Sequence, residues 1–250
     1  PRLENAHSPI ELTSKLYGLE ECINVPQLNL SNNGSLSLSA RLFVNDYLNN
    51  PDYIVEINRL QTNARLQQYL TQELNGQGKE ISPLLTRMDT IDLSGRLNIS
   101  DHHQYGTINI DNRHAEVEIT AEAYDWNRLN VSVSSPKIQL DNLLSDNGKH
   151  ILNRAALKVE ASGLIKDNNG NPSIDIRGIL PELVFDGKEY LDTEIRAQIK
   201  DKKISVNADI QEPDAGITAN ASWRQDTRHH VTGGLNISKY PTDRLALGHR

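Results

Sequence analysis

The sequence predicts an all-β protein dominated by a long antiparallel sheet that curls, with one or two short helices. Apolar and polar residues alternate with a period of two from residue 89 onward, as in strands with one face shielded from water. The turns between these stretches are short, which indicates that consecutive strands pair antiparallel. A long sheet with one apolar face must close, pair with a second sheet or curl over that face. Small residues on the apolar side favour the curl.

The alternation assigns an aliphatic set to the predicted apolar face. The small residues among them are Gly95, Ala121, Ala161, Gly163, Ala197, Ala208 and Ala221. The large residues, which are our candidates for a lipid-binding groove, are Ile91, Leu93, Leu97, Ile99, Val117, Ile119, Val131, Val133, Leu157, Val159, Ile174, Ile176, Ile195, Ile199, Ile204, Val206, Ile210, Ile217, Leu235 and Ile237. An aliphatic face that is poor in aromatic rings can accept flexible acyl chains, whose burial is worth about 0.8 kcal/mol per CH₂. A closed hydrophobic core would give the same alternation.

The chain divides into two predicted segments. Residues 1–88 form a strand-rich segment with strand patterns at 23–30 and 35–44 and an amphipathic helix at 64–74. Residues 89–250 form the repetitive antiparallel sheet, either continuous with the first segment or separate from it. A second helical turn is expected at 140–144, after the strand breaker Pro136.

Composition limits the possible partners. Hydrophobic residues make up 37% and charged residues 24% of the 250 residues, which fits a folded chain. A net charge of -7 without a basic stripe argues against nucleic acid as a partner. The single Cys22 excludes an internal disulfide. No run of about 18 apolar residues occurs, so we expect any membrane anchor to lie outside this fragment.

A motif that resembles part of a metal phosphoesterase site occurs at Asp101, His102 and His103. These residues fall between two alternating stretches, where a solvated hairpin turn is expected, and no second acidic or histidine cluster completes a two-metal site. His229 and His230 likewise open a strand after a polar turn. We interpret both histidine pairs as turn residues.

Two other clusters have an alternative catalytic or metal-binding interpretation. Asp167, Asn169 and Asn171 are spaced like the start of an EF-hand, but Pro172 stands where that loop needs glycine, so a hairpin turn is predicted. The acids of a carbohydrate-processing β-helix enzyme would have to be Glu116, Glu118 and Glu122, which we interpret as a solvated strand face. Cys22 is expected to be a small packed residue. The sequence predicts no enzyme, cofactor or metal site.

Residues 182–223 resemble the strand ladder of TamB and AsmA-like proteins, the translocation and assembly modules, particularly their Bacteroidetes members. The stretch reads ELVFDGKEYLDTEIRAQIKDKKISVNADIQEPDAGITANASW. It contains an aromatic-Asp-Gly-Lys turn, a D-x-x-I-x-A strand, a basic turn and an A-D-I-x-E-P-D-A hairpin. Residues 134–144, 156–163 and 240–247 are similar in style to the recurring units of that family.

The resemblance implies a β-taco, a curled sheet whose apolar concave face is a groove for phospholipid or another lipid. It further implies a periplasmic segment of an envelope protein that is anchored in the inner membrane of a Gram-negative bacterium. Members of the family act in outer-membrane biogenesis and are associated with phospholipid transport toward the outer membrane. The alternative is a non-catalytic structural module that binds an outer-membrane assembly protein through open sheet edges.

Overall fold

A computed structural model describes residues 10–18, 20–32, 36–63, 90–139, 152–185, 188–201, 203–211, 216–224 and 230–239. All the regular elements in these ranges are strands, so the prediction of an all-β fold is confirmed. They are β1 (Ile10–Gly18), β2 (Cys22–Asn32), β3 (Leu36–Asn45), β4 (Asp52–Asn63), β5 (Thr90–Ile99), β6 (His103–Asp111), β7 (Ala115–Tyr124), β8 (Arg128–Gln139), β9 (Leu152–Leu164), β10 (Ser173–Phe185), β11 (Lys188–Lys200), β12 (Lys203–Gln211), β13 (Gly216–Arg224) and β14 (His230–Lys239).

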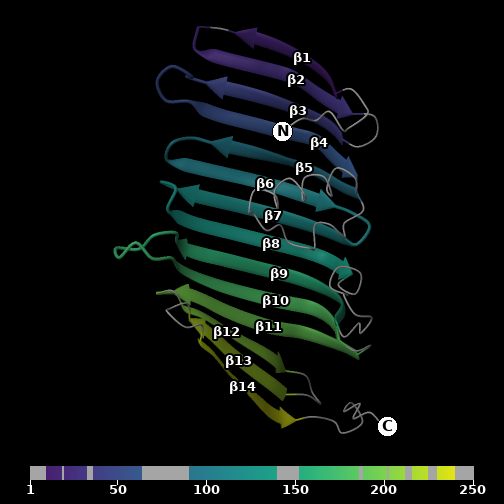
Figure 1. Ribbon diagram of the computed structural model, residues 1–250, viewed down its shortest axis with the longest axis vertical. Coiled ribbons are helices and arrows are strands. Elements are labelled where there is room, and N and C mark those ends of the chain that lie inside the picture. Colours follow the sequence, from purple (N-terminus) through teal and green to yellow (C-terminus); the bar gives the residue numbers. More distant parts are fainter. Residues whose placement is uncertain are drawn as a thin grey trace. The chain divides into compact units, whose positions relative to one another are not determined.

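The strand order of the sheet is the order of the chain, from β1 to β14, which is the meander that the short turns predict (Figure 1). The chain divides into two compact units. Unit 1 contains β1 to β7 and reaches Trp126, and unit 2 contains β8 to β14 and starts at Asn127. Within each unit, every strand pairs antiparallel with the next one along the chain.

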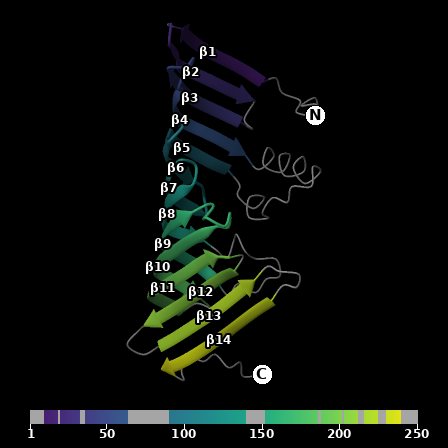
Figure 2. The same ribbon diagram turned by 90° about the vertical axis from the view of Figure 1, so that its left-hand side faces the viewer.

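Each unit is a single layer of strands, and the predicted curl over the apolar face is wrong (Figure 2). Among the described strands of one unit, extensive contacts are made only by sheet neighbours, so none of these strands forms a second layer over either face. The small residues would allow a tight bend, but they do not force one. Neighbouring strands pair without such a bend, apart from local register shifts, and the two faces of each unit remain distinct surfaces.

Bulges interrupt the alternation at defined points. In β2, two residues separate Val25 and Leu28 while one separates their partners in β3. In β4, a similar shift lies between Ile57 and Leu60. Successive side chains of a strand normally point to opposite faces. A bulge takes up one extra residue, so the apolar residues before and after it point to the same face although they are three positions apart. The apolar face of unit 1 therefore continues across each bulge.

Several sequence predictions lie outside the described residues. These are the helices at 64–74 and 140–144 and the segment boundary at 88/89. In the part of the chain that the structure describes, no helix is long and apolar enough to cross a membrane.

Candidate functional site

The apolar side chains of unit 1 form continuous rows across its strands. Cross-strand partners in an antiparallel sheet share a face, so the register defines each row. One row joins Leu12, Leu30, Leu38, Leu60, Leu93, Ile110 and Val117. The next two rows join Leu28, Ala40, Ile57, Gly95, Ile108 and Ile119, and Val25, Leu42, Val55, Leu97, Gly106 and Ala121. We call this surface the apolar face of unit 1.

Unit 2 has an equivalent surface, the apolar face of unit 2. Its central row joins Val131, Ala161, Ile176, Ala197, Val206, Ala221 and Gly233, and small and larger side chains alternate in it as far as Ala221. The flanking rows are Leu129, Gly163, Ile174, Ile199, Ile204, Trp223 and Val231, and Val133, Val159, Gly178, Ile195, Ala208, Ala219 and Leu235. The surface is aliphatic apart from Trp223.

All the groove candidates from the sequence lie on these two faces, either in the rows above or in the rows beside them. Ile91, Leu93, Leu97, Ile99, Val117 and Ile119 belong to unit 1, and the other fourteen belong to unit 2. The structure brings each group together on one face, but without the predicted concave groove. Sequence reasoning missed the contributions of β1 to β4, whose alternation is visible at 36–44 and is broken by the bulges in β2 and β4.

Most residues of the apolar faces are half-buried or exposed, although Val25 and Ala40 in the rows of unit 1 are buried. None of the groove candidates is a buried residue, and most are half-buried. Exposure is greatest at the outer strands, where Leu12 is 63% and Leu235 is 65% exposed. Soluble proteins rarely leave contiguous apolar surface of this kind open unless it binds something.

Two glycines let neighbouring strands approach closely on the apolar face of unit 1. A Cβ added to Gly95 would collide with the backbone carbonyl oxygen of Thr107 on β6. A Cβ on Gly106 would collide with the side chain of Leu97, which packs over it. Gly95 therefore requires glycine for reasons of space, because a backbone atom cannot move aside, whereas at Gly106 the Leu97 side chain would have to change its conformation.

The opposite face of unit 1 is polar and carries ion pairs. Arg41 and Arg96 both pair with Glu56, and Arg59 pairs with Asp92 at 2.6 Å. The hydrogen bond from Arg59 to Asp92, and then the charge of Asp92, raise the pKa of the Arg59 guanidinium. Because this pKa is raised, the contribution of the Arg59–Asp92 ion pair to stability is complete below the ordinary arginine pKa. It is lost only as the pH rises through the higher value. The charge of Arg59 is therefore constant at neutral pH.

The histidines of the predicted hairpin between β5 and β6 make pairwise contacts across the sheet end. His102 Nδ1 lies 2.7 Å from Asp125 Oδ1, and His103 Nε2 lies 2.8 Å from Glu122 Oε1. The Tyr124 hydroxyl donates to the same Glu122 oxygen, and its ring stacks on His103. No group of three or more His, Cys, Asp or Glu residues in the described ranges is arranged to hold a metal ion. Asp101 and His102 lie between β5 and β6 as predicted, whereas His103 is the first residue of β6. His230 is the first residue of β14, and His229 lies outside the described residues.

The predicted turn at residues 167–171 is also confirmed. The Asp167 carboxylate accepts hydrogen bonds from the backbone amides of Asn169 and Asn171, at 2.8 and 3.0 Å, and so holds the turn between β9 and β10. Glu116 and Glu118 are exposed on the polar side of β7. Half-buried Cys22 donates from Sγ to Asn45 at the end of β3.

The described residues offer apolar and charged surfaces on opposite faces of the sheet. The apolar faces can exclude water from an apolar partner, and the polar faces carry paired charges. Comparison with known proteins gave no match to a protein family, to a curated protein or to a solved structure.

Proposed function

We propose that the chain is a periplasmic segment of an envelope-biogenesis protein whose apolar faces shield lipid acyl chains during phospholipid transport toward the outer membrane. The observation that carries the proposal is the pair of continuous, accessible aliphatic faces. The strand-ladder resemblance at 182–223 to TamB and AsmA-like proteins supports the cellular setting. Neither argument requires a catalytic residue or a cofactor.

The chemistry of the faces suits hydrocarbon chains. In unit 2, the small residues Ala161, Ala197 and Ala221 alternate with larger ones along the central row, so short and tall side chains stand next to each other on neighbouring strands. A flexible chain can follow such an uneven surface by rotating its bonds. Each CH₂ removed from water contributes about 0.8 kcal/mol, so a part of an acyl chain suffices for binding while the headgroup stays in water.

This function predicts that the protein purifies with lipid. Protein prepared without detergent should release phospholipid or another acyl lipid on organic extraction, as measured by mass spectrometry against a β-rich protein of similar size without an apolar face. Lipid at the level of the control protein, in repeated preparations from a cell with an outer membrane, would contradict the proposal.

A second candidate function is a structural module that binds other strands through its edges. All nine residues of β1 are exposed, and so are the described side chains of β14, Val231 at 73% among them. Each of these strands has one strand neighbour in the described part of the chain, and an unpaired edge is a template for another strand. This function predicts concentration-dependent self-association in light scattering. A strict monomer that also ignores strand-forming partners would exclude it.

A further inference from the structure

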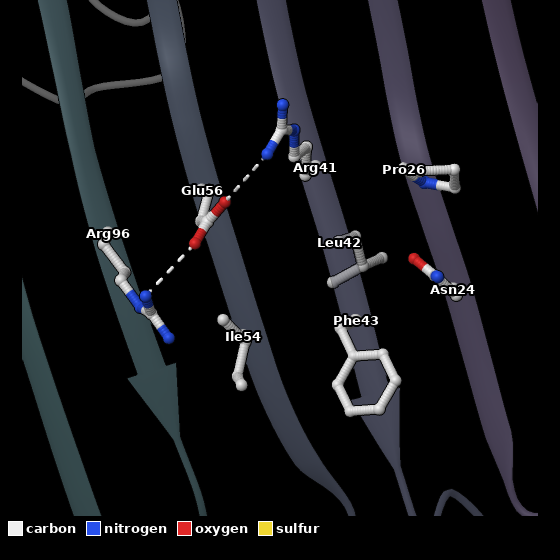
Figure 3. Close-up of a pocket in the computed structure, with 8 residues that line it drawn as sticks. All are labelled: Asn24, Pro26, Arg41, Leu42, Phe43, Ile54, Glu56 and Arg96. Atoms are coloured by element: carbon white, nitrogen blue, oxygen red, sulfur yellow. Dashed lines mark ion pairs between the residues drawn. The ribbon is translucent and has the colours of Figure 1, made fainter.

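The polar face of unit 1 contains a shallow hollow over β2 to β5 that neither face-binding function uses. It has a volume of about 420 Å³ and is lined by Asn24, Pro26, Arg41, Leu42, Phe43, Ile54, Glu56 and Arg96 (Figure 3). We call it the Arg41 hollow. It is built from two adjacent cross-strand rows, one charged and one apolar.

The charged row has more positive than negative charge. Glu56 on β4 is the cross-strand partner of both Arg41 on β3 and Arg96 on β5, and it lies between them in Figure 3. Arg96 Nη1 is 3.2 Å from the carboxylate, but Arg41 Nη1 is 3.8 Å away, beyond hydrogen-bond range. One carboxylate therefore serves two guanidinium groups, and the Arg41 donors remain available to a further oxyanion. This local excess is notable in a chain with a net charge of -7.

The neighbouring row places apolar side chains on a face that is otherwise polar. Phe43 and Ile54 are cross-strand partners, and each lies two residues from the charged row along its own strand. Phe43 is 36% exposed although a large ring is usually kept from water. Asn24, the partner of Phe43 on β2, begins the row, and the bulge of β2 follows at Pro26. Bulges often lie beside binding sites because they redirect neighbouring side chains.

We infer that the Arg41 hollow binds an oxyanion, either a carboxylate or a phosphate, carried on a hydrocarbon chain. The oxyanion accepts hydrogen bonds from Arg41 and Arg96, whose planar donors match both groups. The first part of the chain covers Phe43 and Ile54. The charged and apolar rows that build the hollow lie on the face opposite to the aliphatic rows of unit 1, and of its lining residues Leu42 alone belongs to one of those rows. The charged part of this site is therefore separate from the acyl-chain surfaces of the proposed function.

The test is isothermal titration calorimetry of the intact chain with dodecyl phosphate or dodecanoate below their micelle-forming concentrations. Arg41→Gln should weaken the binding of at least one of them about tenfold. Arg59→Gln, which makes the same change of charge on the same face outside the hollow, should leave it unchanged. Glu56→Gln should tighten binding several-fold, because the internal carboxylate no longer competes for the two arginines. A gain in affinity cannot be explained by misfolding.

Three comparisons complete the design. Phe43→Thr should weaken the binding of dodecyl phosphate more than that of inorganic phosphate, since only dodecyl phosphate has a hydrocarbon chain. Val206→Asp on the apolar face of unit 2 should not change the Arg41-dependent binding, which separates this site from the proposed function. Equal effects of Arg41→Gln and Arg59→Gln would overturn the inference. Equally tight binding of uncharged dodecyl maltoside, or of inorganic phosphate alone, would also overturn it.

Discussion

Replacing Val206 by aspartate should reduce the lipid that purifies with the protein at least about tenfold. Val206 lies in the central row of the apolar face of unit 2, between Ala197 and Ala221, and it is half-buried. An acyl chain on this row would remove water from the new carboxylate without giving it a partner, which is strongly unfavourable. Without lipid, the carboxylate stays partly hydrated, so the sheet should survive.

The matched control is Asn207→Asp, the next residue along β12. Asn207 is exposed on the opposite face, where its cross-strand partners are Arg196 and Asn220. This variant adds the same charge to the same strand and should keep its lipid. Ile217→Asp, between Ile210 and Ile237, should behave like Val206→Asp. Circular dichroism should show equal strand content in all three variants, and equal lipid in the Val206 and Asn207 variants would refute the assignment of the face.

Replacing Gly95 by alanine should destabilise unit 1 by about 2 to 3 kcal/mol. The new Cβ would collide with the backbone carbonyl oxygen of Thr107, and a backbone atom cannot move aside as a flexible side chain can. Gly95 lies between Ile57 and Ile108 in a row of the apolar face, so the strain falls in the middle of the unit 1 sheet. The measurement is the shift in the midpoint of urea unfolding.

Gly18→Ala provides the comparison for Gly95→Ala. A Cβ at Gly18, at the end of the edge strand β1, would meet no atom within 4 Å, and alanine there should leave the midpoint nearly unchanged. Similar shifts for both variants would mean that the cost reflects loss of glycine itself rather than the close approach of β5 and β6.

Much of the fold follows from the sequence, because a period of two in apolar residues directly reports which side chains share a face. The alternation between residues 89 and 237 places every groove candidate on its observed face. The period of two is broken where a bulge adds a residue. Val25 and Leu28, like Ile57 and Leu60, are three positions apart yet share the apolar face. That spacing resembles no strand pattern, so the contribution of β1 to β4 to the face was missed.

Two further features, the lack of a curl and the Arg41 hollow, could not be predicted from the alternation. Alternation specifies which face is apolar, but the same pattern fits a curled, closed or open sheet, and small side chains permit a bend without requiring it. The hollow depends on register, because only the pairing of β3 with β4 and of β4 with β5 brings Arg41, Glu56 and Arg96 together. A hint was present in Phe43, a large ring at a position where the alternation expects a polar residue.

The most direct test of the central claim is photo-crosslinking from two adjacent positions of β12. A photoreactive amino acid at position 206 points from the apolar face of unit 2, and the same amino acid at position 207 points from the opposite face. In cells with an outer membrane, the account predicts lipid adducts at 206 and few or none at 207. Equal adducts at both positions, or none at 206, would contradict the claim that this face shields acyl chains.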